Sequence, residues 1–293
     1  MVYTEHVPVL ANEVVHCLVK RPSGIYIDGT AGSGGHSRKI LEAMSPDGLL
    51  IMLDIDEEAI SYLKNKFTDP RVRIFNASYV DIPHLVGELE ICGKIDGILL
   101  DLGISTHQVY EPTRGFSFMR NGPLDMRFSR EMHTISAYDV VNTYDKEQLI
   151  EIFRKYGEEP HAEEIASAIV ERRKFHPIQT TEELANLVSE IVNETRKHPA
   201  TRVFQAIRIY VNDEFKNIRE GIKGAISVLR KGGRLGVITY HSLEDKLVKR
   251  VFAEYKHKSV ARVIKKHGVR PSWEEKQRNR KSRSAILRVI EKR

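Results

Sequence analysis

The chain has 293 residues, of which 41% are hydrophobic and 29% charged, enough to bury a full core in one large domain or two smaller ones. No run approaches the roughly 20 apolar residues that a membrane span needs, and the start of the chain lacks a basic segment followed by a long apolar stretch, so no membrane association is expected. The two cysteines and the scattered histidines have no metal-ligand spacing, which predicts no bound metal, and so few thiols predict a reducing, cytoplasmic location.

The first predicted strand, residues 25–28, leads into a loop rich in glycine. The loop runs Asp28-Gly-Thr-Ala-Gly-Ser-Gly-Gly-His36, and a helix is predicted from Gly34. Glycine permits a tight turn and lets backbone N–H groups approach a ligand where a helix begins. The loop misses the third glycine of the dinucleotide fingerprint and has no lysine to reach a phosphate. We interpret it as a cofactor loop, with an ordinary strand-to-helix turn as the alternative.

The carboxylate of Asp28 bears on the kind of cofactor. Dinucleotide and triphosphate sites surround an anionic ligand with donors and positive helix ends, so an acid at this strand tip is poorly placed to face a pyrophosphate. S-adenosylmethionine carries a sulfonium and an ammonium and has no phosphate, so an acid attracts it. The sequence therefore predicts S-adenosylmethionine, with a nicotinamide dinucleotide as the alternative.

The second predicted strand, residues 49–54, is a continuous apolar run that ends at Asp54. Asp54 follows Gly35 by 19 positions, the offset at which an acidic side chain accepts hydrogen bonds from ribose hydroxyls. An N-cap of the next helix is the alternative for this acid. Asp56 fits the cap better, which leaves Asp54 for the ribose.

Two further strands, residues 72–76 and 95–101, complete a strand and helix alternation that predicts a doubly wound α/β sheet. Ligands of such sheets bind at the carboxyl ends of the strands, so Asp101 should join the other two acids. Asp101 would bind the methionine ammonium or accept a proton from a substrate amine, and the sequence does not separate these roles. Tyr79 would cover an adenine ring or pack in the core.

The alternation stops near residue 110, where loop and helix segments follow, including 162–173 and 181–195. It resumes with a helix over 211–229, a strand over 234–240, a helix over 242–255 and a strand over 285–290. An all-helical domain inserted after the fourth strand explains this order. The predicted parts are 1–112 and 214–293 for the α/β domain and 113–213 for the insertion.

The end of the chain is strongly basic, with 14 Lys and Arg residues against three acids from Lys256 onward. Lys265, Lys266 and the cations of residues 278–283 surround Trp273, the single tryptophan. Cationic groups beside a flat ring suit a phosphate backbone with unstacked bases. We expect a nucleic-acid contact here, with simple solvation of the charges as the alternative.

Taken together, these motifs resemble the RsmH/MraW family of S-adenosylmethionine-dependent methyltransferases, nearly end to end. The matching segments are His-Val-Pro-Val-Leu (6–10), Gly-Gly-His-Ser (34–37), Asp-Gly-Ile-Leu-Leu-Asp-Leu-Gly (96–103), Arg-Gly-Phe-Ser-Phe-Met-Arg (114–120), Gly-Pro-Leu-Asp-Met-Arg (122–127), Arg-Val-Phe-Gln-Ala (202–206) and His-Ser-Leu-Glu-Asp (241–245).

The resemblance implies methyl transfer to N4 of a cytosine in small-subunit (16S) ribosomal RNA, on a Rossmann-like sheet with an inserted helical domain. It implies cofactor contacts at Gly34, Gly35, His36, Asp54, Tyr79, Asp101 and Gln108. The partner would be the small-subunit RNA or the assembled subunit, and a homodimer is left open. An assembly factor without turnover, and a methyltransferase acting on a protein or small molecule, are the rival functions.

RNA recognition usually stacks a splayed base on an aromatic or guanidinium plane. Phe116 and Phe118 lie in one predicted loop with Arg114 and Arg120, which suits that role, although packing into an interface suits the two rings equally. His241 follows the strand after the insertion and would contact a phosphate or the base, unless it simply begins the next helix beside Ser242. The chain has Asp-Leu-Gly after its fourth strand, where amino-group methyltransferases often carry Pro-Pro-aromatic, so the target atom is not readable from that motif.

Overall fold

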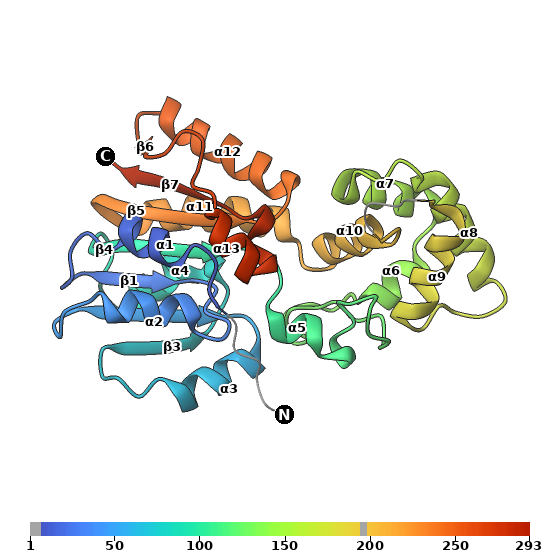
Figure 1. Cartoon of the computed structure of the whole chain (residues 1–293), viewed down its shortest axis with the longest axis horizontal. Helices are drawn as coiled ribbons and strands as arrows, with labels where there is room; N and C mark the ends of the chain where they lie inside the picture. The colour runs from blue at the N-terminus through green and yellow to red at the C-terminus, as the bar shows by residue number, and fades with distance from the viewer. Residues whose placement is uncertain (1–6, 194–197) are drawn as a thin grey trace. The chain divides into compact units, whose positions relative to one another are not determined.

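The computed structural model describes residues 7–193 and 198–293, and the chain divides into two compact units. One contains residues up to Gly103 together with Phe215–Arg293, and the other is Ile104–Glu214. The second unit begins before the predicted residue 113, because helix α5 (Thr106–Tyr110) and the turn after it belong to this unit. Arg120, further along that unit, donates to the Tyr110 carbonyl at 3.0 Å. Each unit has its own core (Figure 1).

A seven-stranded sheet forms the centre of the first unit, in the order β3-β2-β1-β4-β5-β7-β6. The first five strands of this order run parallel, and β7 is antiparallel to both of its neighbours. This confirms the predicted doubly wound α/β sheet. The strands are β1 Ile25–Asp28, β2 Leu49–Asp54, β3 Val72–Asn76, β4 Ile95–Asp101, β5 Leu229–Thr239, β6 Ala261–Val263 and β7 Ile286–Lys292.

The first four strands have the predicted bounds, whereas β5 begins before the predicted residue 234 and β6 was not predicted. The start of β5 contains Gly232 and Gly233, which have low strand propensity and hide the pattern. With three residues, β6 is too short to show an alternation.

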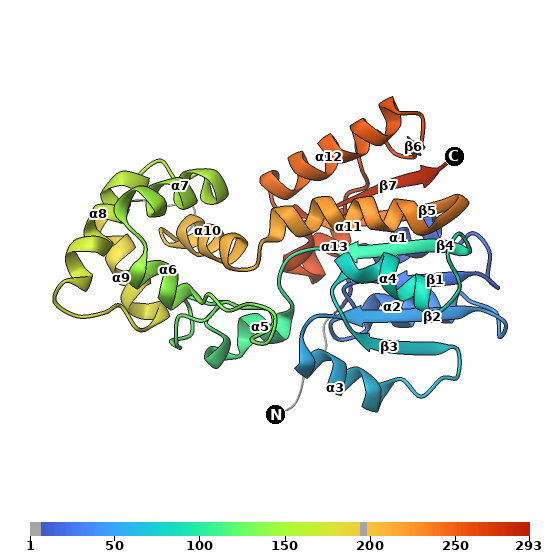
Figure 2. The ribbon, with the colours of Figure 1, turned by 180° about the vertical axis from the view of Figure 1, so that it is seen from behind.

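Helices cover both faces of the sheet because successive strand residues point to opposite sides. Tyr26 packs with one apolar cluster and Ile27 with the other. The first cluster includes side chains of α1, α2 and α3, and the second those of α4, α11 and α12, so the two groups of helices lie on opposite faces (Figure 2). Their bounds are α1 Ala11–Leu18, α2 Gly35–Glu42, α3 Glu57–Lys66, α4 Ile82–Glu88, α11 Glu214–Val228, α12 Ser242–His257 and α13 Trp273–Arg278.

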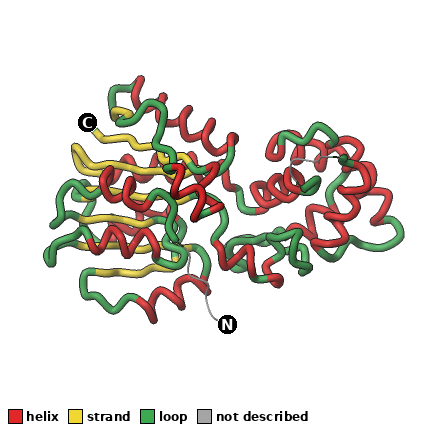
Figure 3. The backbone as a smooth tube through the Cα atoms, viewed as in Figure 1, coloured by secondary structure: helices red, strands yellow, loops and turns green. Residues whose placement is uncertain are grey.

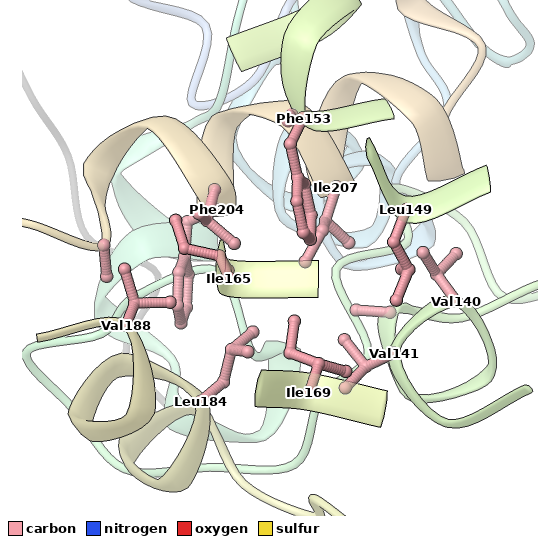
Figure 4. Packing of buried hydrophobic residues seen from close by; sticks show 14 of the residues in the cluster. Val140, Val141, Leu149, Phe153, Ile165, Ile169, Leu184, Val188, Phe204 and Ile207 are labelled. Carbon is pink, nitrogen blue, oxygen red and sulfur yellow. The ribbon is translucent and has the colours of Figure 1, made fainter. Parts of the chain in front are cut away.

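The second unit is built from helices around a single cluster of buried side chains (Figures 3 and 4). Val141, Phe153, Ile169, Leu184 and Phe204 each come from a different helix and meet in this cluster. The helices are α6 Ala137–Thr143, α7 Lys146–Gly157, α8 Ala162–Arg173, α9 Thr181–Ile191 and α10 Thr201–Val211.

Two helices of this unit were predicted, and α8 has the predicted bounds. The helix predicted over 181–195 ends at Ile191 in the structure, and its predicted last residue, Thr195, lies outside the described residues. The predicted helix from residue 211 begins at Glu214, because α10 ends at Val211 with Asn212 as its C-cap.

Candidate active site

The carboxyl ends of the parallel strands place three acids at one edge of the sheet. Asp28, Asp54 and Asp101 are the last residues of β1, β2 and β4. β1 pairs with both other strands, so these tips are neighbours. The arrowheads in Figures 1 and 2 mark this edge. The predicted gathering of the three acids is therefore confirmed.

Five N–H groups of the glycine loop point into the protein. Each of these five finds a carbonyl or carboxylate acceptor within the first unit, so they are not free to form a nest for an anion. This arrangement argues against a phosphate-bearing cofactor. The bonds run from Gly29 to the Leu99 carbonyl, Thr30 to Asp28, Ala31 to the Leu53 carbonyl, Gly32 to Asp54 and Gly34 to the Ala31 carbonyl.

Asp28 is fully buried, and its carboxylate organises the loop. The Ser37 hydroxyl donates to Oδ2 at 2.6 Å, and the Thr30 N–H donates to Oδ1 at 3.3 Å. Burial raises the pKa of Asp28, while His36 and the Ser37 hydroxyl oppose the rise. Through these contacts Asp28 stabilises the conformation of the loop from inside the protein. A direct contact of Asp28 with a cofactor stays a prediction.

Asp54 ties the glycine loop to the start of α3. Its Oδ2 accepts from the Gly32 N–H at 2.7 Å and its Oδ1 from the Asp56 N–H at 2.9 Å. Asp56 caps α3 by accepting from the Glu58 N–H, as the sequence predicted. Burial raises the pKa of Asp54 to about 7, against the lowering effect of the two N–H donors. Each carboxylate oxygen keeps a second lone pair with which to accept a hydroxyl.

Asp101 stands between two ring side chains. The Tyr240 hydroxyl donates to Oδ1 at 2.8 Å, and His36 Nδ1 lies 3.5 Å from Oδ2. The other ring nitrogen of His36, Nε2, lies 2.8 Å from the Val9 carbonyl. A carbonyl only accepts, so Nε2 carries the hydrogen, and Nδ1 faces the Asp101 carboxylate.

Charges and burial act in opposite directions on Asp101. Burial raises its pKa, and His36 and the Tyr240 hydroxyl lower it. Burial and the neighbouring Asp101 hold the pKa of Tyr240 well above its usual range, so the phenol remains a donor. The positive charge of Lys281 also acts to lower the pKa of Asp101, and burial lowers the pKa of the lysine itself. Neither Tyr240 nor Lys281 was predicted as a partner of Asp101, because both lie far along the chain from it.

Tyr79 begins a short 3-10 helix after β3 and is half-buried. The Tyr79 ring packs so closely on Gly221 that a side chain at Gly221 would overlap it. The Tyr79 Cβ lies 3.1 Å from the position that a Cβ at Gly29 would take. Both readings of the sequence fit this position, since the ring packs in the core and its Cβ adjoins the glycine loop.

The remaining predicted cofactor residue, Gln108, lies in the second unit on α5. Its side chain accepts from the Ser105 N–H at 3.0 Å while its own N–H donates to the Ser105 hydroxyl, a reciprocal cap. The sequence missed this cap, although Ser followed by Gln three positions later is its usual pattern. A cofactor contact by Gln108 stays a prediction.

Two of the predicted RNA contacts are occupied inside the second unit. Arg114 is buried and donates to the carbonyls of Arg127 and Phe128 at 3.2 and 2.8 Å. Phe116 is 7% exposed and stacks on Phe128 with ring centroids 5.6 Å apart. The packing alternative describes Phe116, and Arg114 is likewise held within the unit; an RNA contact by either residue stays a prediction.

The other two residues of that loop are more accessible. Phe118 stacks on His198 with centroids 4.3 Å apart and meets Phe204 edge-on. Arg120 is exposed, and its guanidinium lies over the Tyr110 ring at 4.6 Å. An RNA contact by Phe118 or Arg120 stays a prediction.

His241 is the N-cap of α12. This matches the alternative in which His241 begins the helix, except that His241 itself, and not Ser242, provides the cap. Its Nδ1 accepts from the Glu244 N–H at 3.4 Å, and Glu244 in turn accepts from the N–H groups of Tyr240 and His241. Lys265 and Lys266 are exposed in the loop after β6. Contacts of these three residues with RNA stay predictions.

The open face of the glycine loop leads to a first prediction. Gly32 and Gly34 both have positive φ, 51° and 78°, but a side chain at Gly32 would meet nothing within 4 Å, whereas one at Gly34 would overlap the Phe67 ring. Gly32→Ala should therefore cost only the left-handed backbone strain, about 1 to 2 kcal/mol, and Gly34→Ala distinctly more. Thermal unfolding of both variants measures the difference. Equal losses would contradict the packing of Phe67 on the loop.

The residues that the structure describes contain no cluster of His, Cys, Asp or Glu able to hold a metal ion. Nor is any described helix long and apolar enough to cross a membrane.

Comparison with known proteins identifies the family. The model of the MraW methylase family matches residues 3–293. This chain belongs to the MraW methylase family. A family relative from Coprothermobacter proteolyticus is 48% identical over 292 residues, 99% of this chain and 97% of the relative. A second, from Elusimicrobium minutum, is 45% identical over 288 residues, 98% of each. Both are named ribosomal RNA small subunit methyltransferase H, and membership confirms the resemblance seen in the sequence.

Proposed function

We propose that the protein transfers a methyl group from S-adenosylmethionine to the exocyclic N4 amine of a cytosine in the decoding region of small-subunit (16S) ribosomal RNA. One observation carries the choice of donor: three acids gather at the sheet edge while five N–H groups of the glycine loop are hydrogen-bonded within the protein. Such a site favours a cationic nucleoside over a phosphate-bearing one. The names of the relatives supply the substrate.

The residues at the edge fit this donor. Asp54 would accept from the ribose hydroxyls, Tyr79 would lie against the adenine, and the open space at Gly32 leaves the loop accessible. When bound, the donor supplies an electrophilic methyl on a sulfonium. The protein's part is to hold both reactants in line, because the cytosine amine is a poor nucleophile whose lone pair is delocalised into the ring.

The structure favours one of the two roles left open for Asp101. The Tyr240 hydroxyl donates to its Oδ1 and His36 Nδ1 lies 3.5 Å from its Oδ2, so two ring side chains hold the carboxylate in place at the edge where the acids gather. A carboxylate fixed at this edge attracts an ammonium. We therefore assign Asp101 to cofactor binding, with Tyr240 and His36 positioning it; the proton of the methylated amine would pass to solvent water.

A transfer assay tests the proposal. Small ribosomal subunits purified from cells that lack the enzyme are incubated with the protein and methyl-labelled donor, and the modified nucleotide is mapped by mass spectrometry. The proposal expects one labelled N4-methylcytosine in the RNA. Label in a protein or small molecule would favour the rival methyltransferase, and no label with intact donor binding would favour an assembly factor.

The exposed lysines of the basic end offer a test of RNA contact. Replacing Lys265 and Lys266 by Ala should weaken RNA binding and reduce the slope of log affinity against log salt by about 0.7 for each lost contact with a single strand. The matched control is Lys94→Ala, an exposed lysine immediately before β4, at the opposite edge of the sheet. Filter binding over a range of salt concentrations measures the slopes, and identical slopes for wild type and double variant would exclude these lysines.

Cytoplasmic location and use of the assembled subunit belong to the same proposal. Methylation of ribosomal RNA takes place where subunits are assembled, and the small number of cysteines suits a reducing compartment. A homodimer stays a prediction.

A further inference from the structure

The segment from residue 264 to 284 connects β6 to β7 and contains α13 and the 3-10 helix Arg280–Ser284. Figures 1 and 2 both show α13 on the side of the sheet where the parallel strands end, the side of the candidate active site. The charge of this segment is visible in the sequence, but its attachment to that edge is not.

One side of the segment is fastened to the active site. Glu275 accepts from the Leu10 N–H at 2.8 Å, and the Asn279 side chain donates to the Val7 carbonyl at 3.0 Å. The turn between these contacts includes Val9, whose carbonyl lies 2.8 Å from His36 Nε2. A side chain at Gly35 would touch the neighbouring Pro8. Residues 7–10 therefore link α13 to the cofactor loop.

The other side of the segment leaves its largest side chain uncovered. Trp273, the single tryptophan of the chain, is 71% exposed at the first position of α13, after the Ser272 cap. Indole rings usually find partners because of the apolar area they carry. An indole left in water beside an active site is typical of a binding surface.

Cations lie along the same short segment as this ring. Lys276 is one helical turn from Trp273, and the Arg283 guanidinium donates to the Lys276 carbonyl at 3.4 Å, which brings a second cation to the same turn. Arg270 and Arg278 are exposed just before and at the end of α13. The two acids of the first turn do not reverse this charge, because residues 265–283 contain eight Lys and Arg residues.

We infer that Trp273 is a stacking platform for one base of single-stranded RNA, whose phosphates are held by the cations of residues 265–283. This inference rests on the proposed function and deepens it, since RNA held on this segment lies beside the edge where the methyl is transferred. An aromatic face with cations around it accepts any unpaired base. Duplex RNA keeps its bases stacked and cannot use the ring.

Because the chain has one tryptophan, its fluorescence reports on this position alone. The full-length protein is titrated with a short single-stranded oligoribonucleotide of mixed sequence. Saturable quenching of the indole is expected, with little change for the same sequence as a duplex. Trp273→Ala should weaken RNA binding by about 5- to 150-fold, the range of base–aromatic stacking, and Trp273→Phe should restore most of it. Both variants should bind S-adenosylmethionine as the wild type does, which shows that they fold.

Several outcomes would overturn the inference. They are unchanged fluorescence on adding RNA, equal RNA affinity of Trp273→Ala and wild type, and quenching only by a subunit protein or by raising the concentration of the protein itself. The result separates from that of the transfer assay. Quenching by RNA without methyl transfer keeps this surface and removes the proposed reaction. Methyl transfer by Trp273→Ala with an unchanged KM for subunits keeps the proposed reaction and excludes this surface.

Discussion

Asp54→Ala is expected to weaken the binding of S-adenosylmethionine by about 5- to 150-fold, the equivalent of about 1 to 3 kcal/mol for hydrogen bonds to a charged acceptor. Asp54 ends β2 at the acidic edge and keeps lone pairs for ribose hydroxyls beside its bonds to Gly32 and Asp56. Isothermal titration calorimetry at pH 8 measures the loss. Unchanged affinity would mean that the ribose does not lie at Asp54.

The pH dependence gives this prediction a second readout. Burial raises the pKa of Asp54 to about 7 in the ligand-free protein, and hydroxyl donors would favour its charged form and lower that pKa. Binding then releases a proton below about pH 7, so affinity should rise with pH up to that point and level off above it. Asp54→Asn should remove the slope while keeping one oxygen for the loop N–H groups.

Stability of the ligand-free protein should change with pH in the opposite sense. Between the ordinary carboxyl pKa of about 4 and the raised value of about 7, the folded state binds more protons at Asp54 than the unfolded chain does. This group therefore costs stability as pH rises through that window. Melting temperatures of wild type and Asp54→Asn, compared across the window, isolate the contribution.

The second large effect is expected at Asp101. Asp101→Asn keeps the shape of the side chain but removes the charge that His36, Tyr240 and Lys281 face. If Asp101 binds the donor's ammonium, the KM for S-adenosylmethionine should rise by more than tenfold, about 1.4 kcal/mol, while kcat falls less. If it were the proton acceptor, kcat would fall by about 10²- to 10⁴-fold at nearly constant donor affinity.

Tyr240→Phe separates positioning from direct contact in the same measurement. It removes the single hydroxyl that donates to Asp101 at 2.8 Å and leaves the charge in place. A smaller rise in KM than for Asp101→Asn, in the same direction, fits a positioning role. A fall in kcat at saturating donor with unchanged KM would contradict it.

The α/β half of the chain was predictable because its signals are local. Each of the first four strands is mostly apolar and ends at a polar residue, and their bounds are the predicted ones. Asp54 and Asp101 were placed correctly at the sheet edge because a strand terminus fixes where its last residue lies. The cap at Asp56 was predictable because it depends only on neighbouring residues.

The rest of the site depends on contacts that join distant parts of the chain. Tyr240 reaches Asp101 across 139 positions, and Leu10 reaches Glu275 across 265, and no periodicity reports such a pairing. Phe116 shows a different limit. Its loop has the composition of a base-stacking surface, but the ring is buried in the helical core, and the composition of a loop does not show which of its rings the core requires.

A crystal structure of the protein soaked with S-adenosylmethionine shows directly whether a cationic sulfonium nucleoside occupies the acidic edge of the sheet. We expect the ribose hydroxyls on Asp54, the methionine ammonium near Asp101, and the ligand over the open face of Gly32. Density for the donor elsewhere on the protein, or an empty edge at a concentration well above the measured Kd, would contradict it.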